Sequence, residues 1–369
     1  MSNNKVMQDP KLTPAQRAEY FSRRTRKNMQ MLPAIAGAAS STITFDLPKA
    51  RLLSKIRLLV TATLNARHAA NPTYAASTFG PYELLRRVSV SMNNGFIPFI
   101  LSGRELFWYN LVRSSSAEIM PVFPTVATTL ATVNRSRAVQ EVQAAAAPGA
   151  DNIVKFMVDL PISLNDRDPI GLFLLQAPET VVTVSIDFDT VNSIAPAAAG
   201  YTFALSNVVV TPMVETFSVP SDARAMPDLN ILKLVQSTRK AIAGAGVEKV
   251  DLPTGNTFRR LLVYLETAAG VGWTDGALTG DFELIFNQAD IPYRLNPNIL
   301  SGINQEEFAN INIPQGLYIF DFSYQGLPGY GGSRDFIDTE RLTEFWFRFN
   351  APAAGQVTCV YEFLSRLNH

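Results

Sequence analysis

Two pairs of carboxylates come nearest to the spacing of a catalytic or metal-binding pattern. Asp187 and Asp189 are two positions apart in an alternating segment, so both side chains should lie on one face of a strand. A glycoside hydrolase needs two such carboxyl groups, one protonated and one ionised, on either side of a sugar bond. These two occupy the polar positions of a segment whose other positions are apolar, which favours a face in contact with solvent or another protein. Asp166 and Asp168 lie at a predicted helix start, where capping and the helix dipole explain them without a metal.

Other catalytic groups are scarce in the sequence. His68 and the terminal His369 are the two histidines, and no GxSxG motif accompanies them, so neither a Ser/His/Asp site nor a three-histidine zinc site is predicted. The single cysteine, Cys359, lies in an apolar alternating segment and is interpreted as a small core residue. The glycines between positions 326 and 332 are not followed by the Lys-Ser/Thr of a phosphate-binding loop. We therefore predict no catalytic residue, no metal and no cofactor, and do not expect an enzyme.

The three tryptophans raise a different possibility. Trp108 lies in a predicted helix, Trp273 is beside a glycine, and Trp346 is out of phase with Phe345 and Phe347 in a strand. Aromatic side chains at such non-core positions often anchor protein interfaces. A sheet packed on both faces and a carbohydrate-binding platform are the alternatives for these residues.

Composition indicates a chain whose surface is largely covered by other proteins. Its 369 residues suggest two domains, and 47% of them are hydrophobic, which is ample for two cores. Charged residues make up 17%, below the roughly 25% that is usual for soluble domains. We expect copies of the same chain, or other partners, to cover much of its outside. No signal peptide and no membrane-spanning segment is predicted, so the cytoplasm of a producing host cell is the expected compartment.

Charge is concentrated at the N-terminus, although the whole chain has a net charge of zero. The first thirty residues contain seven basic and two acidic side chains, which gives +5 for this segment and −5 for the remainder. A basic arm on a weakly charged body points to anionic partners such as lipid headgroups, nucleic acid or an acidic neighbouring subunit. The body has no basic stripe of the kind that a dedicated nucleic-acid-binding protein carries, so no specific nucleic acid is expected.

Alternating apolar residues predict a mainly β fold. Short runs of period two are separated by Pro and Gly, as in the half-buried antiparallel strands of sandwiches and barrels. The apolar positions of these runs are Ile43, Phe45 and Leu47; Ile56 to Leu64; Val182 to Phe188; Phe282, Leu284 and Phe286; Tyr318, Phe320 and Phe322; Phe345, Phe347 and Phe349; and Val357 to Phe363. We expect Phe45, Val184, Phe286, Phe347 and Cys359 to lie inside the sandwiches.

Helices are predicted to be few and to lie in the connections between strands. Ser102 to Glu105 is a capping box that opens a helix containing Leu106 and Leu111. Asp168-Pro169 resembles an N-cap followed by proline, leading into 172–175. A weaker helix start is predicted at 304–307.

A polar, proline-bracketed segment at 219–228 is the best domain boundary. The two halves that it separates also resemble each other. Phe45-Asp46-Leu47-Pro48 leads into the strand 55–60, and Val250-Asp251-Leu252-Pro253 leads into the strand 259–264. We therefore predict an arm of residues 1–40, a first β-sandwich of residues 41–219 and a second of residues 220–369.

Five segments, in order along the chain, resemble the tectivirus-type double jelly-roll major capsid proteins. They are Leu-Thr-Pro-Ala-Gln at 12–16, Phe-Gly-Pro at 79–81 before a strand at 84–88, a strand–helix–strand unit at 158–188, Pro-x-Gly-x-Tyr at 314–318, and a final strand with its exit at 361–366. The resemblance implies two tandem eight-stranded jelly rolls, short helices in loops, and homotrimers that tile an icosahedral virion shell around an internal membrane, as in a bacteriophage. It implies neighbouring capsomers, penton and minor capsid proteins and membrane headgroups as partners. The alternative is a tandem jelly-roll carbohydrate-active enzyme or lectin.

The N-terminal arm is predicted to be helical. Thr13 to Gln16 is a capping box with proline at the first helical position, and the helix should run past Lys27 towards Met29 and then meet a flexible stretch at 36–39. Its apolar stripe is too thin for deep insertion into a bilayer. Clustered basic side chains, by contrast, can each add about 1 kcal/mol near an anionic membrane surface. The predicted inner-surface or membrane-facing residues are Arg17, Arg23, Arg24, Arg26 and Lys27.

Overall fold

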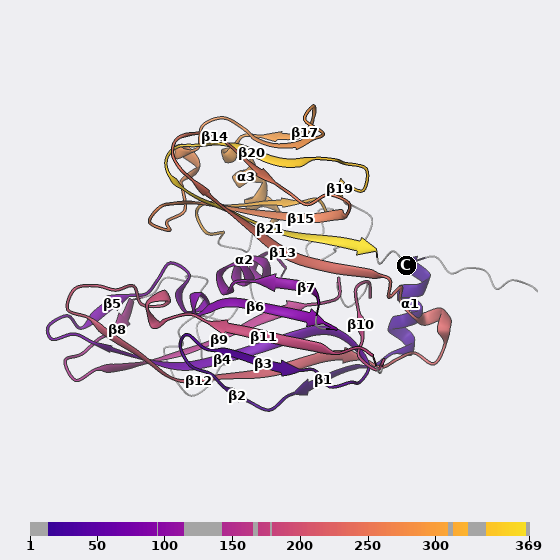
Figure 1. Cartoon of the computed structure of the whole chain (residues 1–369), viewed down its shortest axis with the longest axis horizontal. Helices are drawn as coiled ribbons and strands as arrows, with labels where there is room; N and C mark the ends of the chain where they lie inside the picture. The colour runs from indigo at the N-terminus through magenta and orange to yellow at the C-terminus, as the bar shows by residue number, and fades with distance from the viewer. Residues whose placement is uncertain are drawn as a thin grey trace, which may run out of the picture.

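The computed structural model describes residues 14–93, 95–113, 142–164, 169–177, 179–308, 313–323 and 337–366. Strands dominate this part of the chain, and two lobes lie one against the other (Figure 1). Its α-helices are α1 (Pro14–Arg24), α2 (Gly103–Arg113) and α3 (Pro297–Glu307). Single 3-10 turns form at η1 (Gly80–Leu84), η3 (Val191–Ser193), η4 (Ala223–Ala225) and η5 (Asp275–Ala277). The predicted mainly β fold is confirmed, and none of the described helices has the length and apolar character needed to cross a membrane.

The first lobe is a sandwich of two sheets. Sheet 1A contains, in spatial order, β1 (Lys27–Met31), β12 (Thr202–Phe217), β4 (Leu52–Arg67) and β9 (Ala150–Pro161). Sheet 1B contains β3 (Thr42–Asp46), β11 (Val182–Phe188), β6 (Leu85–Met92) and β7 (Phe96–Leu101). Counted along the chain, these eight strands are ordered 1-8-3-6 and 2-7-4-5, which is the jelly-roll order. The short strands β2 (Ile35–Ala36) and β10 (Phe173–Leu174) extend sheet 1A, and β5 (Thr73–Ala75) pairs with β8 (Val142–Ala144).

The second lobe repeats this order. Sheet 2A contains β13 (Ile231–Ile242), β21 (Gly355–Arg366), β15 (Thr257–Thr267) and β18 (Leu317–Asp321), and β19 (Ile337–Asp338) also pairs with β15. Sheet 2B contains β14 (Gly246–Asp251), β20 (Phe345–Ala351), β16 (Phe282–Phe286) and β17 (Asp290–Leu295). The strands again follow the orders 1-8-3-6 and 2-7-4-5. The predicted pair of eight-stranded jelly rolls is therefore confirmed.

The sequence echo between the halves marks the same corner of each jelly roll. β3 ends at Asp46 and β14 ends at Asp251, and each is followed by a buried leucine and then a proline. Both strands are the second of their eight, and both lead into the long third strand, β4 or β15. The echo is thus a repeat of structure as well as of sequence.

The alternating residues face the two cores as expected. Val184, Phe347 and Cys359 are fully buried, and burial of the thiol raises the pKa of Cys359 to about 12. Phe45 and Phe286 are partly buried and pack against the same two apolar clusters. In β4, the residues at alternate positions are buried while the intervening ones are half-exposed, so sheet 1A has one covered face.

The α2 prediction is confirmed, and the Glu105 carboxylate accepts a hydrogen bond from the Ser102 amide at 2.7 Å, as in a capping box. The expected helix after Pro169 is wrong, because Phe173 and Leu174 instead pair with β4. Asp168 lies outside the described residues.

Helix α3 also begins elsewhere than predicted. Its N-cap is Asn296, whose side chain accepts from the Asn298 amide at 3.0 Å. Asn304, the predicted start, lies in the last turn, where it is buried and bonds both the amide and the carbonyl of Ile319. Asn304 therefore ties the helix to β18, and does not cap it.

The arm is part of the folded body. Helix α1 begins at Pro14 as predicted but ends at Arg24, because Thr25 closes the last turn on the Phe21 carbonyl and β1 begins at Lys27. The expected flexible stretch contains part of β2, in which Ala36 pairs with Val209 of β12. Backbone pairing with β12 therefore replaces the predicted end of the helix and the linker.

Candidate functional site: the interface between the two jelly rolls

The two jelly rolls meet edge to edge. Strand β7 of sheet 1B runs parallel to β13 of sheet 2A, with Phe99 opposite Val235, so the two sheets form one continuous sheet. Beside this pair, the Gln236 side-chain amide donates to the Ile97 carbonyl at 3.4 Å. Helix α2 follows β7 directly and lies between the lobes (Figure 1). The outer face of sheet 2A is therefore covered by the first jelly roll.

The centre of the interface is apolar. Trp108 of α2 is completely buried, and its ring centroid lies 4.5 Å from that of Tyr264 on β15 and 5.3 Å from that of Phe79. The residues on the outer face of sheet 2A, such as Leu262 and Val360, belong to the apolar core of the first jelly roll. Burial of this much aromatic surface fixes the two lobes to each other.

Three ion pairs join α2 to sheet 2A around this apolar centre. Both terminal nitrogens of Arg104 donate to the Glu266 carboxylate at 3.0 Å. Glu105 accepts from Arg239 Nε at 2.9 Å and from Ser237 Oγ at 3.0 Å. Arg113, at the end of the helix, donates to Glu362 at 2.9 Å. Bidentate and charge-assisted bonds of this kind are directional, so they set the angle between the lobes.

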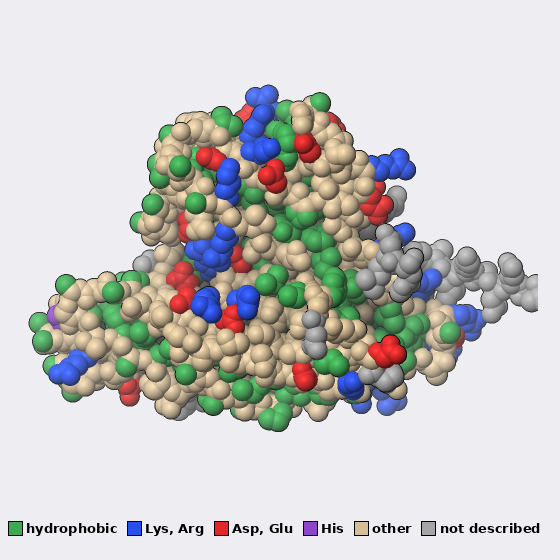
Figure 2. Space-filling model, in the orientation of Figure 1, with side chains coloured by type: hydrophobic (Ala, Val, Ile, Leu, Met, Phe, Trp, Pro, Cys, Tyr) green, Lys and Arg blue, Asp and Glu red, His purple; other side chains and the backbone are tan. Residues whose placement is uncertain are grey.

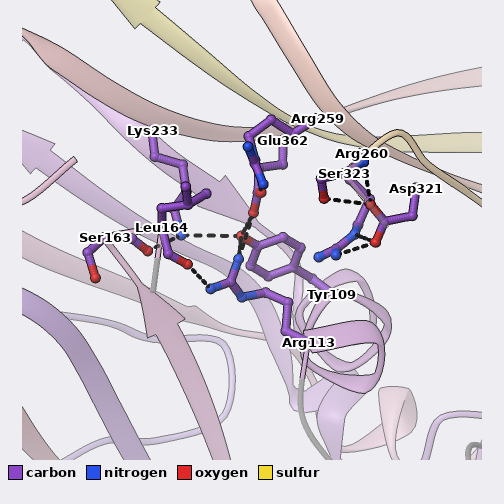
Figure 3. Close-up of polar contacts among 10 residues, drawn as sticks. All are labelled: Tyr109, Arg113, Ser163, Leu164, Lys233, Arg259, Arg260, Asp321, Ser323 and Glu362. Atoms are coloured by element: carbon purple, nitrogen blue, oxygen red, sulfur yellow. Dashed lines mark hydrogen bonds and ion pairs between the residues drawn. The ribbon is translucent and has the colours of Figure 1, made fainter. Parts of the chain in front are cut away.

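Glu362 is the centre of a buried polar cluster (Figure 3). Its carboxylate accepts hydrogen bonds from Tyr109 and Arg113, and Arg259 Nε lies 3.5 Å from its other oxygen. Lys233 donates to the Ser163 carbonyl at 2.8 Å and to the Tyr109 hydroxyl at 3.4 Å. Beside this cluster, Arg260 is paired with Asp321, whose carboxylate also accepts from Ser323.

The electrostatics keep Glu362 ionised. Burial alone would raise the pKa of Glu362, but Arg113, Lys233 and the β15 arginines lower it below its usual range. Burial, reinforced by Arg113, lowers the pKa of Lys233 well below its ordinary value. Burial also raises the pKa of Tyr109. Tyr109, Lys233, Arg259 and Glu362 are at most 3% exposed, and Arg113 bonds both Glu362 and Tyr109. The arrangement is therefore suited to holding two domains together.

The predicted solvent-facing carboxylates do not form a site. Asp187 is buried, which corrects the prediction of a solvent or interface face, because β3 and β6 flank its strand and supply partners. Thr42 donates to it at 2.7 Å, and Arg87 Nε lies 2.8 Å away. Asp189 is half-buried and accepts from the Thr190 amide. Asp166, Asp168, His369 and residues 326–332 lie outside the described part of the chain.

The three tryptophans lie in different environments. Trp108 and Trp273 are buried, so their predicted non-core positions are wrong. Trp346 is half-buried on the outer face of sheet 2B, with Lys249 Nζ 3.3 Å from its ring centroid. His68 closes a turn by accepting from the Ala70 and Asn71 amides. Within the described residues, no group of three His, Cys, Asp or Glu side chains is placed to hold a metal ion.

Helix α1 is fixed by one apolar side chain. Phe21 is buried against Leu52, Leu172 and Phe217 on the outer face of sheet 1A. Of the predicted arm residues, Arg23 pairs with Glu19 at 2.6 Å, Arg24 lies over the Tyr20 ring, and Arg26 is exposed, as Arg23 and Arg24 are.

The other two predicted arm residues, Arg17 and Lys27, lie on different elements. Lys27 lies on β1, outside the helix, 2.8 Å from Glu215, and Arg17 is half-buried on α1. Helix α1 lies at the same end of the molecule as the end of β21 (Figure 1), and Figure 2 shows basic side chains there.

Sequence reasoning missed the inter-lobe interface. One signal was present: Leu261 to Leu265 is a continuous apolar run, which is typical of a strand buried on both faces. No sequence pattern predicted that Arg113 and Glu362 would bond each other, because 249 positions separate them along the chain.

Comparison with known proteins gives one consistent answer about the fold. No family model matches the sequence, and no curated protein matches it. Solved structures do match, and they define the class: this is the double jelly-roll fold of viral major capsid proteins. The major capsid protein of Sulfolobus turreted icosahedral virus matches with a TM-score of 0.67 at 14% identity, covering 92% of this chain and 97% of that one.

Two further structures support the same assignment. The major capsid protein of bacteriophage PM2 matches with a TM-score of 0.55 at 11% identity, covering 93% of this chain and 99% of that one. The PBCV-1 virus capsid matches with a TM-score of 0.59 at 11% identity, covering 92% of this chain and 93% of that chain. These likenesses span both lobes, so the shared feature is the complete two-domain architecture.

Proposed function

We propose that this chain is a viral major capsid protein, in which the tandem jelly rolls form the wall of an icosahedral shell. The observation that carries the proposal is the α2 interface, which makes one rigid block of two jelly rolls through Trp108 and the Glu362 cluster. A shell subunit has to keep a fixed shape under load from its neighbours. The role is structural, and we propose no enzymatic activity.

The domains are residues 41–219 and 220–369, preceded by an arm of residues 1–40. In support, β12 ends at Phe217 and β13 begins at Ile231, with η4 between them. The arm supplies β1 and β2 to sheet 1A, so it also completes the first jelly roll.

The functional unit is a homotrimer of pseudo-hexagonal outline, because three copies of two similar jelly rolls give six similar walls. Weakly charged lateral surfaces, in a chain with 17% charged residues, favour such symmetric association. Neighbouring capsomers, penton proteins and minor capsid proteins are the proposed partners. The virion capsid is the proposed location, after synthesis in the host cytoplasm.

The native mass of the purified protein tests this proposal. The expected result at micromolar concentration is a particle of three times 40.5 kDa. A particle with the mass of one chain under all ionic conditions would contradict the proposal.

The arm is proposed to lie on the inner side of the shell and to meet anionic headgroups of an internal membrane. Arg23, Arg24 and Arg26 are exposed on and just after α1, which supports this position, while Phe21 holds the helix on the body. Near an anionic surface each basic side chain contributes about 1 kcal/mol.

Replacing Arg23, Arg24 and Arg26 by glutamine tests the role of the arm. Binding to phosphatidylcholine vesicles that contain phosphatidylglycerol should weaken by on the order of 100-fold, and trimers should still form. The matched control replaces three exposed arginines elsewhere, Arg67, Arg86 and Arg341, and should bind like the unmodified protein. Equal weakening in both variants would show that the arm has no special role.

A further inference from the structure

The corner turns of the two jelly rolls lie at the same end of the molecule. The turn between β3 and β4 is beside the start of β7, because Leu47 and Met92 both pair with Val182. The turn between β14 and β15 is beside the start of β13, because β15 and β13 both start opposite the end of β21. Since β7 and β13 run parallel, the two turns share one end, which is that of α1 because Phe21 packs against Leu52 at the start of β4.

The two turns differ in the residue that takes the left-handed backbone conformation. In the second jelly roll this residue is Gly255, with a φ of +80°, whereas in the first it is Arg51, with a φ of +68°. Glycine adopts this conformation freely, but a residue with a side chain is strained in it. Backbone strain of this kind is concentrated at functional positions. Arg51 is therefore a candidate functional residue.

Among the described residues, none forms a hydrogen bond or ion pair with the Arg51 side chain, which is exposed. The Arg51 carbonyl oxygen accepts from the Leu175 amide at 2.9 Å, a bond that any residue type would make. Lys49, two residues earlier on the same turn, is also exposed. A contact within the described chain therefore does not explain why an arginine occupies this strained position.

Arg51 continues the basic surface of the arm. Leu52 and Lys27 are both opposite Phe217 in sheet 1A, so Arg51 and Arg26 come next, at the ends of the two strands that flank β12. Neighbouring strands are about 5 Å apart, so about 10 Å separates the two backbones. Because a guanidinium group donates two parallel hydrogen bonds to a phosphate, the two arginines can bind neighbouring phosphates of one anionic surface.

An apolar side chain lies beside these arginines. Ser218, on the strand between them, accepts from the Arg26 amide at 3.0 Å through its hydroxyl, and its own amide donates to the Arg26 carbonyl at 3.0 Å. Val219 follows directly and is 38% exposed. The boundary between lipid headgroups and acyl chains accommodates basic and apolar side chains together, whereas nucleic-acid binding depends on the basic ones. The combination favours a lipid surface as the partner.

The corner of the second jelly roll lacks this basic character. On its turn, Thr254, Gly255 and Asn256 stand where the first turn has basic residues, and Asp251, just before the turn, is 77% exposed. The exposed charged residues around the first turn are mostly basic: Arg23, Arg24, Arg26, Lys27, Lys49, Arg51 and Arg224, with Glu19, Asp46 and Glu179. Around the second turn they are mixed: Asp251, Asp290, Asp338 and Glu340, with Lys249, Arg341 and Arg366. An anionic surface is therefore attracted to the first corner more than to the second.

We infer that Arg51 and Lys49 bind the phosphates of anionic lipid headgroups, and that the corresponding turn of the second jelly roll does not. This inference rests on the proposed function. It adds a segment of the folded body to the arm as a lipid-binding element, and it confines lipid contact to one of the two jelly rolls. The strained backbone at Arg51 is retained because it holds the guanidinium in line with Arg26.

Replacing Arg51 by glycine separates this role from a structural one. Arg51→Gly relieves the backbone strain, so the melting temperature should hold or rise, by up to about 2 °C. Binding to phosphatidylcholine vesicles that contain phosphatidylglycerol should nevertheless weaken about fivefold, because one cation is lost. Arg51→Lys keeps the charge and should bind like the unmodified protein. A lower melting temperature of Arg51→Gly with unchanged vesicle binding would show a structural role and overturn the inference.

A matched pair of variants tests the difference between the two corners. Lys49→Gln should also weaken vesicle binding about fivefold, whereas Arg341→Gln, at an exposed position of the second corner, should leave it unchanged. Equal weakening by the two variants, or tighter binding of the unmodified protein to single-stranded DNA than to the anionic vesicles, would overturn the inference. The native mass of the same samples tests the proposed function separately. Trimers that bind vesicles regardless of Lys49 and Arg51 contradict the inference alone, and unmodified protein that never forms trimers contradicts the proposed function.

Discussion

The two jelly rolls have the same strand order but differ in how their larger sheets are covered. In sheet 2A, every residue from Leu261 to Leu265 is at most 1% exposed, because one face meets its own core and the other meets the first jelly roll. In sheet 1A, β4 alternates between buried and half-exposed positions, and its outer face carries Arg57, Leu59 and Thr61.

The difference shows how one strand order can carry two patterns of side-chain burial. A strand buried on both faces has a continuous apolar run, and a strand with one covered face alternates. Sheet 2A is covered by the other jelly roll of the same chain, whereas among the described residues helix α1 packs on one end of the outer face of sheet 1A. Each sheet has a buried glutamate, Glu362 with the buried partner Arg259 and Glu215 with the half-exposed partners Lys27 and Arg57, which makes the comparison open to experiment.

Corresponding core positions test whether the two interiors are packed alike. Val184 and Phe347 occupy the same place in β11 and β20, each opposite the residue before the Asp-Leu-Pro corner. Phe347→Ala should lower the free energy of unfolding by about 3–5 kcal/mol and Val184→Ala by about 2 kcal/mol, because a larger cavity remains in the first case. Chemical denaturation measures both, and an unchanged midpoint for Phe347→Ala would show that the strand phase is wrong.

The two buried glutamates, Glu362 and Glu215, test how strongly the inter-lobe interface excludes water. Glu362→Gln should destabilise the protein by about 3–4 kcal/mol, because it leaves Arg113, Arg259 and Lys233 without their buried anion. Glu215→Gln should cost about 1 kcal/mol, because water can reach its partners Lys27 and Arg57. Calorimetry of the two variants gives the comparison, and equal losses would mean that the lobes are not locked by this cluster.

The pH dependence of stability tests the role of Glu362 in the same comparison. Because the pKa of Glu362 is lowered in the folded state, its contribution is fully present above the ordinary carboxyl pKa of 4.5 and is lost only as the pH falls through the lowered value. The difference in melting temperature between unmodified protein and Glu362→Gln should thus be constant from about pH 7 to 5 and shrink below about pH 4. A difference that already disappears at pH 6 would argue against an ionised, sealed Glu362.

The smallest loss of folding stability is expected for a substitution on the outer face of sheet 2B. Trp346→Ala removes the contact with Lys249 on a half-exposed surface, and should cost about 0.5–1 kcal/mol. Thermal denaturation measures this change. A loss as large as that of Phe347→Ala would place Trp346 in a packed interface.

Sequence patterns predicted the fold because they follow from local geometry. Alternation located β11, β16, β20 and β21 closely, and the Asp-Leu-Pro repeat identified the same corner in both halves. Capping residues located the starts of α1 and α2. Errors occurred where strand pairing overrode local preference, as at Lys27–Met31, which pairs with β12 and so ends the predicted helix.

The interface was beyond sequence reasoning for a physical reason. Arg113, Lys233 and Glu362 come from three elements distant in sequence, and only the folded topology brings them together. Asp187 was misjudged because its polar position is covered by a neighbouring strand. Charged residues at alternating positions indicate a second face, but they do not show what covers it.

Electron microscopy of the purified protein tests the central claim most directly. Class averages viewed along the symmetry axis should show a threefold particle with six lobes, two from each chain, and concentrated samples should form curved sheets or shells of these particles. Single two-lobed particles at micromolar concentration, with no threefold class under any ionic condition, would contradict the account.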